Sequence, residues 1–295
     1  MKKNSYKKNF IKNNSHKNNS HKNSSLKNNY KLLTGALMII LLILAAVFTP
    51  FIARSDPYAT NLAYRLEPPG SVGLLGTDHL GRDVFARLVH GARLSIVISL
   101  VTLLISLVVG LVTGLAAGYF RGICDSIITF VMEVLLAFPG MILSLAVVGI
   151  LGAGMFNAVA AVALVSWIEY ARLVRGMTLS LKEREFVKAA KISGTGHIGI
   201  ITRHILPNVI NPVIIYSATH ISVIMLQLAA LSFLGLGVQL PTAEWGAMLN
   251  DARGFMVLAP WLTIAPSAAL VFMVSAFNLL GEGLTERGVE RTQNF

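Results

Sequence analysis

Long stretches without a charged residue constrain this chain more than any other feature. Residues 94–120 and 208–243 contain no Asp, Glu, Lys or Arg. An α-helix rises about 1.5 Å per residue, so about 20 apolar residues cross the hydrocarbon core of a bilayer, which is about 30 Å thick. With 54% hydrophobic and only 13% charged residues over 295 positions, the chain is predicted to be an all-α polytopic membrane protein.

Six transmembrane helices are predicted. A single helix from Asp125 to Glu169 would be about 65 Å long, twice the thickness of a bilayer. This charge-poor region is therefore divided into two spans that turn near residues 149–157. The run 208–243 exceeds one span, so its end near Gly235 is expected to bend into a surface or re-entrant segment. The other expected spans are residues 32–53, 94–120 and 255–280.

The basic residues orient these helices. Nine lysines and no acidic residue lie in residues 1–31, and Lys and Arg are enriched on the cytoplasmic side of membrane proteins. Residues 1–31 are therefore predicted to be a disordered basic cytoplasmic tail, residues 54–93 an external loop and residues 282–295 a cytoplasmic tail. A cleaved signal peptide is the rival interpretation of residues 32–53, but the apolar run is too long and no small-residue cleavage site is evident.

Several function classes are excluded. The net charge of +11 does not predict nucleic-acid binding, because the lysines gather in the tail and near span ends. A metal held by His16 and His21 is less plausible than a solvated tail, and the single cysteine, Cys124, rules out an intrachain disulfide. The sequence has no G-x-x-x-x-G-K-[ST] motif, nucleophile elbow or metal-ligand cluster of recognised spacing. We therefore expect no enzymatic activity, no cofactor and no resident metal.

Three glycines predict close helix packing. Gly110, Gly114 and Gly118 recur every four residues in the apolar run 94–120. This spacing lines one helix face with residues that lack a side chain, which allows two membrane helices to approach closely. No substrate is needed to explain it.

Glu133 is the only charged residue between Asp125 and Glu169. An ionisable side chain in lipid costs roughly 2.5–3.5 kcal/mol on insertion scales, so it should face the bundle interior or a cation. Arg172 and Arg175, which enter the same leaflet on the next span, are the candidate partners. A structural ion pair is favoured over a transport role.

Polar side chains at bilayer depth also mark candidate pathway positions, because they seek the interior of the bundle. His220, Met225 and Gln227 lie midway along the run 208–243 and are the candidates to line a substrate pathway. A lone histidine in a helix bundle is more often a hydrogen-bonded packing residue, so that alternative stays open for His220.

Residues 180–207 form the longest charged, amphipathic interruption of the apolar sequence. A short helix over residues 182–193, ended by Gly194 in a left-handed cap, is predicted to precede a second short helix, residues 197–206, closed by Pro207. The apolar side of the first helix is formed by Phe186, Val187 and Ala190. Such a helix, turn and helix is suited to a groove on another protein. The alternative is a basic loop held by lipid headgroups.

These residues resemble the cytoplasmic "EAA" loop of ABC importer permeases, because Ala189, Ala190, Gly194, Leu206 and Pro207 match its Ala, Ala, Gly, Leu and Pro. Lys188 stands where that loop has its Glu, with Glu185 one turn earlier, and His204 stands where the family often has Ile. The resemblance implies a coupling segment, residues 180–207, that contacts an ATPase. The residues expected to couple are Glu185, Lys188, Ala189, Ala190, Gly194, Leu206 and Pro207.

Two further stretches resemble the peptide and nickel branch of these permeases. They are LLGTDHLGRDVFARLVHGARLS, residues 74–95, and PTAEWGAMLNDAR, residues 241–253, the latter most similar to the nickel permease "C" subunit. The candidates for contacting an external protein or substrate are Asp78, His79, Arg82 and Asp83. A hydrogen-bonded elbow that caps the next helix is the favoured alternative for these four residues.

The resemblance covers residues 32–287 and implies a permease core, residues 94–281, with five helices of the methionine-importer type. It further implies a second homologous permease subunit, two cytoplasmic ATPase subunits and an external substrate-binding protein in the inner membrane of a prokaryote. Nickel, free or chelated, is the favoured cargo, with di- or oligopeptides as the alternative. A passive channel or proton-coupled carrier would need a relay of intramembrane acids and an inverted repeat, and a membrane anchor would not need six spans.

Overall fold

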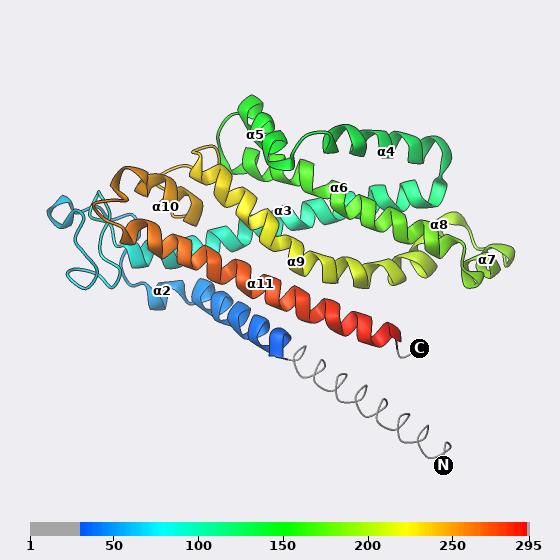
Figure 1. Cartoon of the computed structure of the whole chain (residues 1–295), viewed down its shortest axis with the longest axis horizontal. Helices are drawn as coiled ribbons and strands as arrows, with labels where there is room; N and C mark the ends of the chain where they lie inside the picture. The colour runs from blue at the N-terminus through cyan, green and yellow to red at the C-terminus, as the bar shows by residue number, and fades with distance from the viewer. Residues whose placement is uncertain (1–29, 294–295) are drawn as a thin grey trace, which may run out of the picture.

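The computed structural model describes residues 30–293, with side chains described as far as residue 287 (Figure 1). Within this part of the chain every regular element is a helix and no β-strand occurs, so the chain is an all-α polytopic membrane protein. The predicted N-terminal tail, with His16 and His21, lies outside the described residues apart from its last two positions. Five helices are long and apolar enough to cross a membrane: Tyr30–Val47, α3 (Val84–Phe120), α6 (Met155–Lys182), the continuous helix His197–Phe233 and α11 (Trp261–Gln293).

A bent pair of helices brings the number of possible spans to six. Helix α4 (Gly122–Leu136) and helix α5 (Gly140–Leu151) meet at an angle of 91°. The break falls at Pro139, which lacks a backbone N–H and disfavours a helical conformation in the residue before it. The predicted turn near residues 149–157 is confirmed, because Gly152 and Gly154 have positive φ angles of 90° and 155°. The first of the two predicted spans is therefore broken and not straight.

Helices α3 and α6 form the most extensive helix pair. A Cβ atom added at Gly114 would lie 2.6 Å from the carbonyl oxygen of Ala171, and one at Gly118 would lie 2.6 Å from Cβ of Thr178. The side of α3 that carries the three glycines thus contacts α6 backbone to backbone, which confirms the predicted close packing. Helix α3 begins at Val84, earlier than the predicted Leu94, because Asp83 accepts hydrogen bonds from the first-turn N–H groups of Phe85 and Ala86.

The second helix of the coupling segment does not end at Pro207. A short helix, α8 (His197–Ile200), continues through a π-helical turn (Ile201–Ile205) into α9 (Leu206–Phe233). Pro207 lies in the first turn of α9. A proline has no backbone N–H to donate, and the π-helical turn before it shifts the hydrogen-bond register so that this donor is not needed. The bend predicted near Gly235 is confirmed: α9 ends at Phe233 and Gly235 has φ +79°.

The N-terminal helix packs along α11. A Cβ added at Gly35 would lie 2.5 Å from the backbone nitrogen of Leu280, and Lys31 Nζ lies 3.0 Å from Glu282 and 2.9 Å from Glu286. The predicted polar tail from Gly281 is consequently helical, because these contacts extend α11 as far as Gln293. Helix α11 begins at Trp261, directly after Pro260, and not at Phe255.

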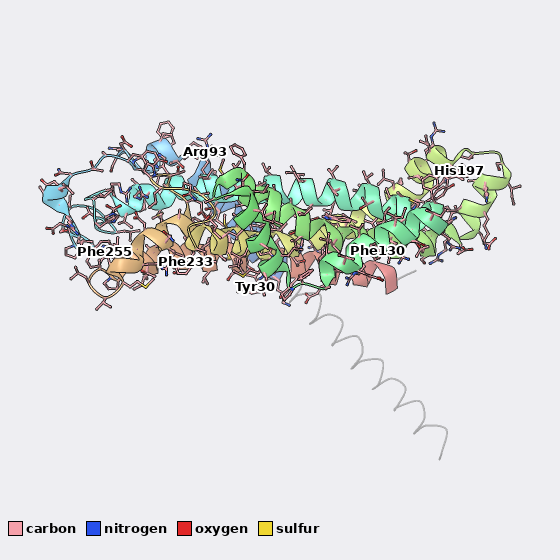
Figure 2. All side chains as sticks on the ribbon, turned by 90° about the horizontal axis from the view of Figure 1, so that it is seen from above. Tyr30, Arg93, Phe130, His197, Phe233 and Phe255 are labelled. Carbon is pink, nitrogen blue, oxygen red and sulfur yellow. The ribbon has the colours of Figure 1, made fainter. Side chains whose placement is uncertain are left out.

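The long helices run beside one another, and the short elements lie at the two ends of the bundle (Figure 1). Helix α2 (Thr49–Ile52), the loop before α3 and helix α10 (Trp245–Ala252) lie at one end, while α7 (Glu185–Ile192) and α8 lie at the other. Figure 2 shows the same separation, with Phe255 and His197 at opposite ends. The C-terminal end of α11 points toward the end that carries α7 (Figure 1).

Candidate functional site: a coupling segment, a membrane cavity and an external ion-pair cluster

The coupling segment contains the predicted short helix, although it begins at Glu185 because α6 continues to Lys182. Gly194 has φ +82°, its N–H donates to the carbonyl of Lys191, and the N–H of Thr195 donates to the carbonyl of Ala190. These two bonds form a Schellman cap, which confirms the predicted left-handed end of the helix. The end of α7 and the start of α8 are thus held in a defined turn.

The coupling segment projects apolar side chains into solvent. Val187 is buried in the main hydrophobic cluster, but Ile192 and Ile198 are 88% and 77% exposed. Ala189 is exposed, Ala190 is half-buried and no atom lies within 4 Å of a Cβ added at Gly194. Lys188 Nζ lies 3.4 Å from a carboxylate oxygen of Glu185, so the acid one turn earlier neutralises the lysine that replaces the Glu of the motif. Leu206 is half-buried and Pro207 exposed at the start of α9, away from the turn.

Hydrogen bonds tie the coupling segment to the ends of α3 and α6. Tyr119 Oη lies 2.9 Å from Nδ1 of His197, and Lys182 Nζ donates to the carbonyl of Tyr119 at 2.6 Å. Arg121 and Glu183 form an ion pair at 2.9 Å. A cavity of about 360 Å³ lies between these residues and α7. Helix α8 is therefore bonded to α3 through His197 and Tyr119 and is continuous with α9.

A second cavity, of about 440 Å³, lies between the α4–α5 bend and helices α6 and α9. Two of the three predicted pathway residues, His220 and Gln227, line it. His220 is 8% exposed, and its Nδ1 lies 3.2 Å from the hydroxyl of Tyr170. The third, Met225, packs instead in the cluster that includes Trp245 on α10, so the structure does not bring it to the cavity. Met225 is therefore a packing residue, while the buried, hydrogen-bonded position of His220 matches the packing alternative stated for that residue.

The cavity also has members that the sequence argument missed. Glu169 on α6 and Tyr216 on α9 line it together with His220, and the Tyr216 ring stacks on His220 with centroids 5.1 Å apart. The signal available in the sequence is Glu169 itself, an acidic residue that directly follows the charge-free residues 134–168.

The predicted ion pair of Glu133 is wrong for Arg175. Arg175 Nε and Nη2 donate to the two carboxylate oxygens of Asp125 at 2.6 and 2.9 Å, whereas Glu133 is exposed on α4. Arg172 is also exposed and has no ion pair within residues 30–287. This bidentate hydrogen bond holds α4 against α6. Glu133 takes no part in it and lies on the exposed face of α4.

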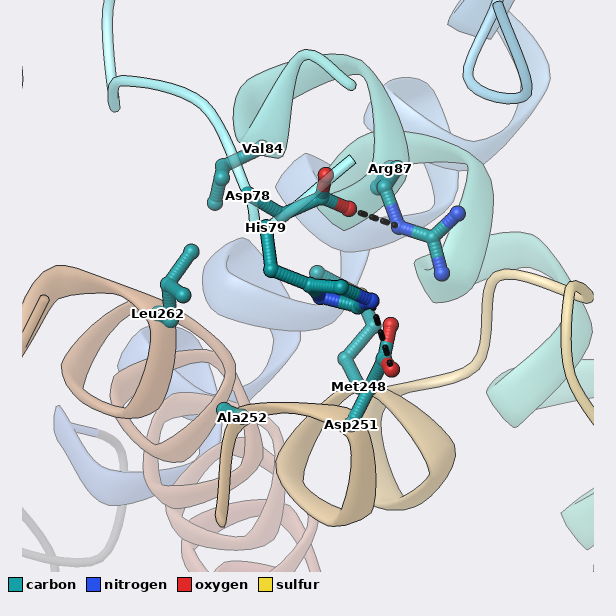
Figure 3. Close-up of a pocket in the computed structure, with 8 residues that line it drawn as sticks. All are labelled: Asp78, His79, Val84, Arg87, Met248, Asp251, Ala252 and Leu262. Carbon is teal, nitrogen blue, oxygen red and sulfur yellow. Dashed lines mark ion pairs between the residues drawn. The ribbon is translucent and has the colours of Figure 1, made fainter. Parts of the chain in front are cut away.

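At the opposite end of the bundle, an ion-pair cluster joins the loop before α3 to α10 (Figure 3). Asp78 accepts from Nε of Arg82 at 2.6 Å, and Nη2 of Arg82 donates to Asp251 at 2.6 Å. His79 stacks on Phe255 with ring centroids 5.0 Å apart, and its Nε2 lies 3.7 Å from Asp251. Ligand atoms of Asp78, His79 and Asp251 lie within 4.8 Å of one another, but Arg82 bonds to both carboxylates and Arg87 Nε lies 3.7 Å from Asp78.

The four residues proposed for external docking are thus used largely within the chain. Asp78 and Arg82 are 5% and 2% exposed, and Asp83 caps α3 and accepts a hydrogen bond from Ser55. His79 and Asp83 are half-buried, and only they remain partly exposed. This geometry favours the capped elbow over a docking surface.

Glu244 is a buried acid that the sequence argument also missed. It is 1% exposed, and its carboxylate accepts from the N–H groups of Gly246 and Ala247 at the start of α10 and from the hydroxyl of Ser95 on α3. Burial raises the pKa of Glu244, and the hydrogen bonds offset only part of this effect. This carboxyl therefore joins α10 to α3 without a cationic partner within the described residues.

Comparison with known proteins places the chain in a family. Residues 110–292 match the family described as "Binding-protein-dependent transport system inner membrane component", and residues 24–69 match the "N-terminal TM domain of oligopeptide transport permease C". The chain is 40% identical over 258 residues to the dipeptide transport system permease protein DppC of Alkalihalophilus pseudofirmus, covering 88% of this chain and 85% of the relative. It is 42% identical over 262 residues to the glutathione transport system permease protein GsiD of Escherichia coli O6:K15:H31 and to that of Shigella boydii serotype 4, covering 88% of this chain and 86% of each relative. The chain therefore belongs to the family of binding-protein-dependent transport system inner membrane components and is a multi-pass permease subunit of an ABC importer.

Proposed function

We propose that this chain forms part of the membrane pathway of an ATP-driven importer of small peptides. The observation that carries the proposal is the similarity over 88% of the chain to permeases named for dipeptide and glutathione transport. The sequence by itself favours nickel as the cargo, whereas these relatives favour the alternative, peptides. In support, the only group of His and acidic side chains within residues 30–287 close enough to share a metal ion lies at the predicted external end, where Arg82 and Arg87 pair with its carboxylates.

The coupling segment is the proposed contact with the ATPase subunits. Ala189, Ala190 and the Schellman turn at Gly194 form a compact surface, and the exposed Ile192 and Ile198 supply apolar area that a protein groove would bury. Lys188 and Glu185 lie on the same helix, and Leu206 and Pro207 begin α9. Because α8 continues through the π turn into α9, a displacement of α8 by ATPase closure moves the wall of the membrane cavity.

The cavity lined by His220 and Gln227 is the proposed cargo path, which opens alternately to the two sides of the membrane. In this arrangement a second, homologous permease subunit covers the exposed faces of α4 and α6, two ATPase subunits bind at the cytoplasmic end, and an external binding protein delivers the cargo. Both termini are cytoplasmic. Most of the affinity for cargo then resides in the binding protein.

Replacing Ala190 by Arg tests the coupling role. A long charged side chain on the half-buried side of α7 should prevent the ATPase from seating, so we expect at least about a tenfold loss of dipeptide uptake. Copurification of the ATPase should be lost too, while the amount of permease in the membrane is unchanged. The matched control is Ala59→Arg in the exposed external loop, which should retain uptake. Normal uptake by the Ala190→Arg variant would contradict the proposed contact.

A further inference from the structure

Helix α6 carries two charges without a partner in the described part of the chain, at the depth where lipid tolerates them least. Glu169 lies halfway along Met155–Lys182, about 20 Å from either end of the helix. Both Glu169 and Arg172, one turn nearer the cytoplasmic end, are exposed. Neither forms an ion pair or a hydrogen bond with residues 30–287. A bare carboxylate facing hydrocarbon would cost roughly 2.5–3.5 kcal/mol on insertion scales, so this face of α6 must border water, cargo or another protein.

The cavity beside Glu169 offers hydrogen-bond acceptors. Gln227 lines the same cavity, and its buried side-chain oxygen, Oε1, accepts no hydrogen bond from the described residues. His220 lines the same cavity but contacts the Tyr170 hydroxyl through Nδ1 and does not donate to Gln227. The opposite wall, formed by Leu135, Leu136 and Phe138, is apolar. A cargo therefore fits this cavity best when its N–H donors face Glu169 and Gln227.

We propose that Glu169 and Gln227 bind the ammonium group of cargo as it passes, so that this permease itself selects for cargo with a free amino group. The inference rests on the proposed import of peptides. An ammonium group carries three N–H donors and one positive charge, so it complements the unpaired carboxylate and the orphaned amide oxygen in turn as cargo passes along the cavity wall. Arg172, about 4.5 Å further along the helix axis, does not line the cavity and places a positive charge one turn beyond Glu169. Selection by amino group is then a property of the membrane path as well as of the binding protein.

Charge-selective thiol labelling tests the proposal without the binding protein. Val223 lines the same cavity and is 47% exposed, so a single cysteine is placed there in a Cys124→Ser background, in the assembled transporter. We compare labelling rates by a cationic and an anionic methanethiosulfonate of similar size, each normalised to its reaction with a free thiol. With Glu169 present the cationic reagent should be favoured about tenfold more than in the Glu169→Gln variant, as expected for a unit charge at a few ångströms in a partly aqueous site.

The matched control is Glu133→Gln, which removes an equally exposed carboxylate from α4 that does not line the cavity. It should leave the labelling ratio unchanged. Two results would overturn the proposal: a labelling ratio that is the same in the transporter with Glu169 and in the Glu169→Gln variant, or a cysteine at position 223 that neither reagent reaches. Failure of the Glu169→Gln transporter to assemble would also overturn it, because Glu169 would then be the partner of a cation on the second subunit.

Protection by peptides supplies the second readout. A dipeptide with a free amine at saturating concentration should slow labelling of the cysteine at position 223, its N-acetyl form should not, and the difference should vanish in Glu169→Gln and shrink in Gln227→Leu. Equal protection by both peptides would contradict amine recognition. ATP-driven dipeptide uptake by the wild-type transporter is measured in parallel. If uptake is absent while the charge preference persists, the proposed function of peptide import is contradicted but the cation selectivity of the cavity is not.

Discussion

Buried polar side chains at the external end are satisfied within the chain. Arg82 bridges Asp78 and Asp251, and the carboxyl of Glu244 caps α10 and bonds to α3. Such groups are costly to bury unless each hydrogen bond is made. These bonds hold three elements together as one unit: the start of α3, the loop that precedes it, and α10. This unit lies at the end of the molecule opposite the coupling segment.

Replacing Glu244 by Gln tests this buried carboxyl. The amide retains one acceptor for the start of α10 but leaves one N–H unsatisfied, which costs about 1–3 kcal/mol. Burial raises the pKa of Glu244 above its ordinary value of 4.5. The carboxyl's contribution to stability is therefore full below pH 4.5 and falls as the pH rises through the raised pKa, because the unfolded state then releases the proton more readily.

The destabilisation of Glu244→Gln relative to wild type should consequently be larger at acidic pH than at neutral pH. Thermal unfolding of the two proteins in detergent micelles across this range measures the difference. Glu185→Gln is the control, since its side chain is 92% exposed and its removal should change the melting temperature little at any pH. A deficit of Glu244→Gln that grows as the pH rises would show that the carboxyl is stabilised as an anion.

At the scale of elements, the contact between α3 and α6 depends on glycine. At Gly114 an added Cβ would lie 2.6 Å from the carbonyl oxygen of Ala171 and 2.8 Å from Cβ of Val174. The pair must therefore separate to admit even a methyl group. The same two helices carry the glycine contact, the cavity wall and the attachment of the coupling segment, so their spacing affects each of these features.

Gly114→Ala should destabilise the protein, whereas Gly149→Ala should not. Both glycines lie within helices, where Ala is favoured over Gly by about 1 kcal/mol, but no atom lies within 4 Å of a Cβ added at Gly149 on α5. Overpacking at Gly114 should cost about 1–3 kcal/mol. Melting temperatures measured by size-exclusion chromatography after heating compare the two variants, and equal stability would show that α3 and α6 have room to spare.

For the whole molecule, the ion pairs of Lys31 with Glu282 and Glu286 place the start of the N-terminal helix beside the C-terminal part of α11. In Figure 1 the C-terminal end of α11 points toward α7, and the loop before α3 lies at the opposite end of the bundle. Both termini and the coupling segment are therefore predicted to share one side of the membrane, and the basic residues assign that side to the cytoplasm.

Single cysteines in the Cys124→Ser background test this orientation. Ser71→Cys, in the exposed loop before α3, should react with a membrane-impermeant thiol reagent in intact cells. Ser193→Cys, exposed in the coupling segment, should react only after the membrane is opened. Labelling of Ser193→Cys in intact cells, or protection of Ser71→Cys, would reverse the assignment.

Sequence alone was sufficient where the physics is local. A charge-free run of more than about 20 residues spans a bilayer whatever lies beside it, and a glycine spacing of four predicts a close helix face. The left-handed end of α7 at Gly194 likewise depends on the backbone of one residue. Membership of the permease family follows from such local patterns and from the match of residues 110–292.

Only the tertiary structure decided which side chains meet. It paired Arg175 with Asp125 and left Glu133 exposed, extended α11 beyond Gly281 by packing it on the N-terminal helix, and placed Glu169 and Gln227 on one cavity. The physical reason is that a membrane helix is apolar on every side, so its hydrophobic pattern does not specify the neighbouring helix. That choice is made by shape, by close approach at glycine and by the few polar groups that must find partners.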